Sequence, residues 1–201
     1  RWLEGRCLSY AGVIPYFPFQ DLLREWLGVS ATDHETKVRI ELRAALGPLF
    51  STRADEVYPY LGAMLRLPLE PEVAAQIANL SAESLQHQTF NVIREWATRL
   101  AAEQPLAFIL DDLHWADSTS LVLLEALLEV TEDAPVLLCL LFRPEREHGS
   151  WRVNDLARQR FPHRHVEIIL PPLAPAHAEE LVSHLLTVPD LAAESRHVIL
   201  L

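Results

Sequence analysis

The chain has 201 residues, of which half are hydrophobic and 22% are charged, a balance typical of a globular protein and not of a disordered one. The net charge of −11 and the single lysine argue against a nucleic-acid surface, because phosphate backbones are bound by clustered lysines and arginines. No apolar run reaches the ~18 residues of a membrane span, and nothing resembles a signal peptide, so we expect a cytoplasmic protein with no membrane partner.

The first half of the chain predicts one short strand followed by helices. Residues 3–9 form the strand candidate, and a loop with two prolines leads from it into a helix that ends before Gly28, a typical C-cap residue. A second helix is predicted to start at Thr32 or Asp33 and to end at Gly47-Pro48. Further helical periodicity is expected over three segments: 54–66, 70–79 and, with Ser81 as N-cap, 82–103.

The second half alternates apolar runs with helical segments. Residues 106–110 are continuously apolar, which is typical of a strand buried on both faces of a parallel sheet. Two similar strands are predicted at 136–142 and 166–170. Helices are expected between and after them, at 118–130, 151–161, 175–187 and 190–201. Alternation of this kind predicts an α/β fold with a doubly wound parallel sheet.

The two cysteines, Cys7 and Cys139, are too few for a disulfide framework or a zinc site. Both fall in apolar runs that are predicted to form strands. We therefore expect two buried, reduced thiols.

The sharpest chemical feature follows the strand at 106–110, where Asp111 and Asp112 are adjacent. Open parallel sheets bind ligands beyond the carboxyl ends of their strands. Two carboxylates buried there without partners would be costly, and a bound Mg²⁺ would compensate. The alternative is a strand that ends at the surface with solvated aspartates. Asp117 has two open interpretations, a further site residue or the N-cap of the next helix.

The string Leu106 to Asp117, which ends Asp-Asp-Leu-His-Trp-Ala-Asp, resembles the Walker B segment of STAND-type, AAA-related P-loop ATPases. Weaker matches flank it: Trp2 to Pro18 is similar to the second strand and its loop, Thr131 to Glu147 to the fourth strand, and Leu170 to Leu186 to the end of the fifth strand with its helix. Such domains occur in bacterial multidomain regulators, fused to class III adenylate/guanylate cyclase, protein kinase or LuxR-type DNA-binding modules.

The resemblance implies ATP and Mg²⁺ as cofactors and a role for each matched residue. Asp111 would hold Mg²⁺, Asp112 would be the catalytic carboxylate, and Arg143 would read the γ-phosphate from the end of the neighbouring strand. A surface ion pair with Glu145 or Glu147 is the plain alternative for Arg143. His114 and Trp115 are expected to pack the segment against the next helix.

The resemblance also divides the chain as one partial domain. Residues 1–16 would be the second strand and its loop, 17–104 a long all-α insertion, 105–170 the Walker B and sensor strands, and 171–201 the first C-terminal helices. The chain starts without a methionine and stops in an apolar run, which together predict an internal piece of a longer protein.

The phosphate-binding loop of such ATPases, G-x-x-x-x-G-K-[ST], is absent, because none of the six glycines precedes a lysine and the single lysine, Lys37, lies in a helical pattern. We expect the first, central strand to be missing with it, from a position between the strands at 136–142 and 166–170. The isolated chain should then be poorly stable and bind ATP weakly or not at all.

Two other functions are considered beside a signalling ATPase that regulates an attached effector domain. One is a nucleotide-dependent switch with little or no turnover, which sequence cannot distinguish from an ATPase. The other is a metal-dependent hydrolase that uses Asp111, Asp112, His114 and Asp117, with the more distant His163 and His165 as ligands.

Overall fold

The computed structural model describes residues 1–177, 180 and 181. The chain divides into two units, residues 1–165 and 166–201, and the account below concerns the first unless stated otherwise. In the described part, no helix combines the length and the apolar character that a membrane crossing requires.

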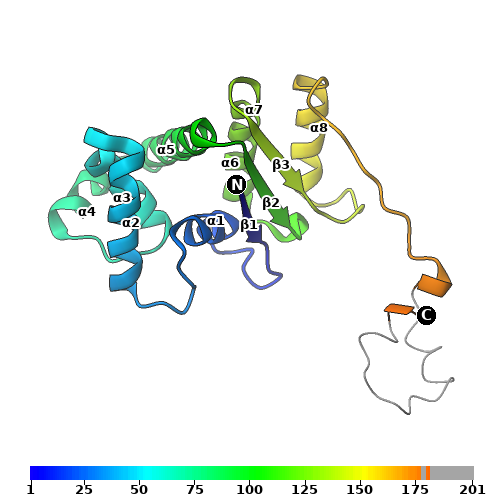
Figure 1. Cartoon of the computed structure of the whole chain (residues 1–201), viewed down its shortest axis with the longest axis horizontal. Coiled ribbons are helices and arrows are strands. Elements are labelled where there is room, and N and C mark those ends of the chain that lie inside the picture. Colours follow the sequence, from blue (N-terminus) through cyan, green and yellow to red (C-terminus); the bar gives the residue numbers. More distant parts are fainter. Residues whose placement is uncertain (178–179, 182–201) are drawn as a thin grey trace, which may run out of the picture. The chain divides into compact units, whose positions relative to one another are not determined.

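Three parallel strands form the sheet of the first unit, in the order β1-β2-β3 (Figure 1). Their bounds are Trp2–Arg6 for β1, Leu106–Asp111 for β2 and Val136–Leu140 for β3. The register sets Arg6 opposite Asp111 at the carboxyl end of the sheet. A parallel sheet with helical connections confirms the predicted α/β class.

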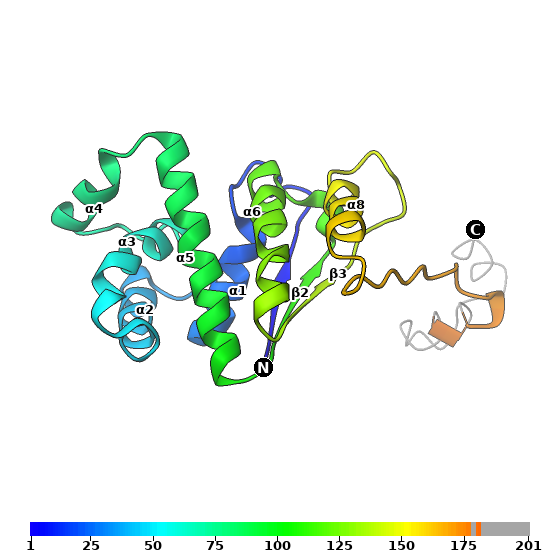
Figure 2. The same ribbon diagram turned by 90° about the horizontal axis from the view of Figure 1, so that it is seen from above.

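All the residues between β1 and β2 belong to helices or to the loops that join them. The helices are α1 (Phe17–Leu27), α2 (Glu35–Phe50), the short η1 (Ser51–Arg53), α3 (Ala54–Met64), α4 (Pro71–Ala78) and α5 (Ala82–Glu103). Figures 1 and 2 both show α2, α3 and α4 grouped away from the sheet, with α1 and α5 between them and the strands. Gly28 ends α1 in the left-handed conformation and Ser81 caps α5, as predicted.

Short elements complete the second half. They are η2 (Leu113–Trp115), α6 (Ser118–Leu128), α7 (Val130–Asp133) and, after β3, α8 (Ser150–Arg160). The strands and helices predicted up to residue 161 are present, and their observed ends differ from the predicted ones by a few residues.

Aromatic packing ties the helices to the central strand. Trp96 of α5 is fully buried and stacks on Phe108 of β2, with ring centroids 5.4 Å apart. The ring of Trp26 in α1 packs edge-on against the ring of Trp96, with centroids 5.6 Å apart. At Gly5 of β1, a Cβ atom would lie 2.4 Å from the carbonyl oxygen of Pro18, so only glycine permits this approach of α1 to the strand. These contacts fix α1 and α5 against the sheet.

The strands are not buried on both faces in the described part of the chain, which corrects the prediction. Burial alternates along β2, and on β3 Leu137 and Cys139 are exposed, so Cys139 is not the buried thiol that was expected. Cys7 is buried as predicted, and burial raises the pKa of its thiol to about 12. The physical reason is that an apolar strand sequence allows both faces of the sheet to be covered but does not require it. The helices described here pack on one face of the sheet.

The two outer edges of the sheet differ. Along β1, the backbone N–H of Glu4 donates to the Glu25 carboxylate and that of Arg6 to the Asp21 carboxylate, so α1 caps this edge. Among the described residues, β3 pairs with β2 alone, and its other edge has no strand beside it. Exposed strand edges are normally covered or paired.

Two further expectations are wrong. Residues 166–170 form no strand in the second unit, and the side chains of Val166, Ile168, Ile169 and Leu170 are all more than 75% exposed. An apolar run becomes a strand only when a neighbour pairs its backbone, and no described strand does so. Helix α2 continues through Gly47-Pro48, since a proline in the last turn removes one N–H only and the turn buries Leu49 and Phe50.

The C-terminal helix predictions lie mostly outside the described residues. Of the helix predicted at 175–187, residues 175–177, 180 and 181 are described and are helical. The helix predicted at 190–201 lies outside the described residues altogether.

Candidate functional site

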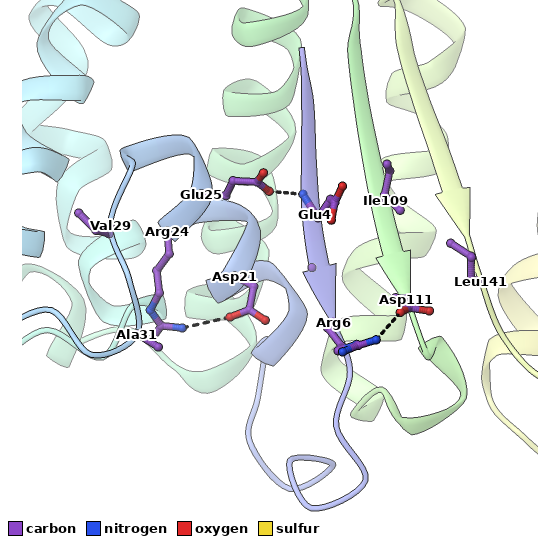
Figure 3. Close-up of a pocket in the computed structure, with 11 residues that line it drawn as sticks. Glu4, Arg6, Asp21, Arg24, Glu25, Val29, Ala31, Ile109, Asp111 and Leu141 are labelled. Carbon is purple, nitrogen blue, oxygen red and sulfur yellow. Dashed lines mark hydrogen bonds and ion pairs between the residues drawn. The ribbon is translucent and has the colours of Figure 1, made fainter. Parts of the chain in front are cut away.

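Asp111 is the last residue of β2, the middle strand, and its side chain lies on the open face of the sheet (Figure 3). A depression of about 690 Å³ lies along this face beside α1. It is lined by residues of β1 and β2, by the residue that follows β3, and by residues of α1 and the loop after it: Glu4, Gly5, Arg6, Ile109, Asp111, Leu141, Asp21, Arg24, Glu25, Val29 and Ala31. The acid is therefore at a concave surface at the carboxyl ends of the strands, where parallel sheets bind ligands.

Both carboxylate oxygens of Asp111 have partners. Oδ2 accepts a hydrogen bond from Nη2 of Arg6 at 3.1 Å, and Oδ1 accepts the backbone N–H of Asp112 at 2.9 Å. Figure 3 shows the Arg6 side chain reaching across from β1 to β2. The Asp111 side chain is 41% exposed, so it is accessible to an ion or ligand from the depression.

Asp112 begins the turn after β2 in the left-handed conformation, with φ 55° and ψ 34°. Aspartate and asparagine adopt this conformation more readily than other non-glycine residues. Asp112 is half-buried and is not among the residues that line the depression. The two adjacent acids thus occupy different surroundings, which the sequence does not reveal.

Arg143 follows β3 and is exposed, with its guanidinium carbon 5.7 Å from the centre of the Trp115 ring. In the described part of the chain Arg143 makes no ion pair with Glu145, Glu147 or any other acid, so the plain alternative to a site role finds no support. Like Asp112, it does not line the depression. It emerges at the same edge of the sheet as Asp111, because β2 and β3 are parallel neighbours.

His114 is buried in the turn after β2, and neither ring nitrogen has a hydrogen-bond partner. Its ring packs on Trp115 and on His148 of the loop after β3, with centroids 4.5 and 5.4 Å apart. Burial and then the nearby Arg143 charge lower the pKa of His114, so it is a neutral packing residue at pH 7. The ring of His114 thus contacts the loop after β3; the predicted packing against the next helix stays a prediction.

Asp117 is the N-cap of α6. It is buried, and its carboxylate accepts the backbone N–H of Ser120 at 2.9 Å and the Ser120 hydroxyl. Of its two sequence interpretations, the geometry supports the capping residue.

We expect Asp117→Ala to destabilise the protein by about 1–2 kcal/mol, the usual cost of losing a side-chain N-cap. Denaturant unfolding measures this change. Asp117→Ser keeps an acceptor at the cap and should recover most of the loss. If Asp117→Ala left stability unchanged and abolished nucleotide binding, the capping interpretation would be wrong.

The structure does not bring together the residues of a metal-dependent hydrolase. Among residues 1–177, 180 and 181, no group of three or more His, Cys, Asp or Glu side chains could hold a metal ion. His163 pairs with Glu132 at 3.0 Å and His165 bonds Asn154 at 2.9 Å. The described residues therefore give that alternative no support. A single accessible carboxylate fits Mg²⁺, which is usually held by one or two carboxylates, water and substrate phosphates.

The sequence analysis missed the lining residues other than Asp111, and among them Arg6 is the direct partner of Asp111. Its contact with Asp111 joins residues 105 positions apart and depends on the register of β1 on β2. The predicted strand at 3–9 placed Arg6 in its interior, whereas the observed strand ends at Arg6, so its position beside the end of β2 was not visible from the sequence.

The sequence model of the AAA ATPase domain family matches residues 1–141. The match covers all three strands and ends just after β3. No curated protein and no solved structure shows a significant match.

Proposed function

The chain belongs to the AAA ATPase domain family, and we propose that it supplies the magnesium-binding acidic strand of a signalling ATPase. In this proposal Asp111 holds Mg²⁺ through water, and Asp112 orients or deprotonates the attacking water. Arg143 contacts the γ-phosphate of ATP with its fork of donors. The Mg²⁺ would neutralise phosphate charge in the reaction.

One observation carries the proposal. Asp111 ends the middle strand of a parallel sheet and lines a depression at the carboxyl ends of the strands. An acid that faced open solvent away from any concave surface would have opposed the proposal. The open sheet face and the accessible carboxylate support it.

We also propose that the phosphate-binding loop and a further strand come from residues outside this sequence. The sequence contains no G-x-x-x-x-G-K-[ST], and its single lysine, Lys37, pairs with Asp33 at 2.9 Å at the start of α2. No described strand pairs with the outer edge of β3, which supports the proposal, since a strand could add there, whereas α1 caps the edge of β1. The helices of residues 17–104 would then be an insertion between neighbouring strands of the sheet.

The attached effector is also part of the proposal: a cyclase, kinase or DNA-binding module of the same parent chain, regulated by the nucleotide state. Turnover and switching both fit the site, because each needs the same Mg²⁺-nucleotide contacts.

We expect the full-length protein to bind a fluorescent ATP analogue, and the isolated 201-residue chain to bind it at least roughly 100-fold more weakly. The chain lacks several charge-assisted hydrogen bonds from a phosphate-binding loop, each of which contributes about 1.5–3 kcal/mol. Fluorescence titration with Mg²⁺ measures both affinities, and circular dichroism checks that the chain is folded. Micromolar binding by the folded chain would contradict the proposal that the loop lies elsewhere.

A further inference from the structure

Arg6 forms an ion pair with Asp111, the residue proposed above to hold Mg²⁺. The two residues are direct partners in the β1–β2 register, so their side chains emerge on the same face of the sheet. Arg6 Nη2 and Asp111 Oδ2 are 3.1 Å apart, and the remaining oxygen, Oδ1, is taken by the backbone N–H of Asp112. Arg6 is thus the counter-ion of Asp111 in this state of the protein.

The strand backbone holds Arg6 in place, while its side chain extends into solvent. Its N–H bonds Asp21 of α1, whereas its side chain is 64% exposed. The neighbouring Arg24 also lines the depression but pairs with Asp21, at 3.4 Å. Two arginines therefore lie in one depression, and only Arg6 contacts the acid that ends β2 (Figure 3).

We propose that Arg6 competes with Mg²⁺ for Asp111, so that the metal requirement of nucleotide binding is set by the exchange of this ion pair. The proposal rests on the proposed function, in which Asp111 is the magnesium residue. A cation that approaches Asp111 must displace a guanidinium already in contact with the carboxylate, and this displacement weakens the apparent Mg²⁺ affinity. Removal of the Arg6 charge removes the competitor.

The test is a Mg²⁺ titration of the full-length protein with a fluorescent ATP analogue, scored by binding and not by turnover. We expect Arg6→Gln to lower the half-saturating Mg²⁺ concentration by about two- to fivefold, the range in which exposed ion pairs act. Arg6→Lys keeps a cation and should stay near the wild type. Arg24→Gln is the matched control, because it removes the same charge from the same depression without touching Asp111.

Each outcome has one meaning. A shift in Arg6→Gln that Arg24→Gln lacks supports the competition. Equal shifts of the half-saturating Mg²⁺ concentration in both variants overturn it, because a general change of electrostatic potential in the depression would explain them. No shift in either variant also overturns it, because Arg6 would then have no effect on Mg²⁺. Thermal unfolding confirms that the variants are folded, as expected for exposed side chains. If the wild type binds no nucleotide at any Mg²⁺ concentration, the proposed function itself fails, a result distinct from loss of the competition alone.

Discussion

Asp112→Asn is expected to lower ATP turnover of the full-length protein by about 100-fold or more, while nucleotide affinity changes little. The expected size follows from the loss of a general base or water-orienting carboxylate, a contribution of about 10²–10⁴-fold. The substitution suits the backbone, because Asp112 has φ 55° and asparagine also adopts the left-handed conformation. Alanine would add strain at this position and confuse the result.

Single-turnover hydrolysis and equilibrium binding of the ATP analogue measure the two effects separately. Asp133→Asn serves as the matched control, since this exposed aspartate ends α7 and precedes β3, at the opposite end of the sheet. Unchanged turnover in Asp112→Asn would remove Asp112 from the catalytic role. Signalling to the effector then distinguishes the two functions: if it persists without hydrolysis the domain is a switch, and if it is lost turnover matters.

The parts of the fold that the sequence predicted well depend on local chemistry. Ser81 caps α5 through a hydrogen bond to a residue three positions ahead, so the signal is contained in a few neighbouring letters. Asp117, which the sequence left open between a site residue and a cap, makes the same contact at α6. Gly28 ends α1 because glycine accepts a positive φ at no cost. The Asp-Asp pair after the apolar run likewise locates the end of β2 without reference to distant residues.

The predictions that failed concern which strand pairs with a segment and which face of the sheet a helix covers. The runs at 136–142 and 166–170 were both predicted to be strands, yet the first pairs with β2 and the second with no described strand. Cys139 was expected to be buried and is exposed, because sequence does not record which sheet face a helix covers. The Arg6–Asp111 contact was missed for the same reason, since strand register is a property of the assembled sheet.

The second large effect is expected at Arg143, where substitution by alanine should reduce turnover by about 100- to 1000-fold. A fixed cation that meets charge developing on the γ-phosphate is worth this much when it is removed. Arg143 is suited to the role by its place after β3, its exposure and the absence of an ion pair within the described residues. Lysine should recover part of the activity only, because a point charge lacks the planar fork of guanidinium donors.

Comparison with Arg146→Ala makes the Arg143 measurement specific. Arg146 lies on the same loop but is directed to α8, where its guanidinium is 4.1 Å from the Trp151 ring centre and 4.0 Å from Asp155. Its removal should leave turnover near the wild type. Because Arg143 is proposed to act on the transition state, its loss should lower kcat far more than it weakens ATP binding. Equal losses of binding and turnover, or equal effects of the two arginines, would show that Arg143 contributes only general positive charge.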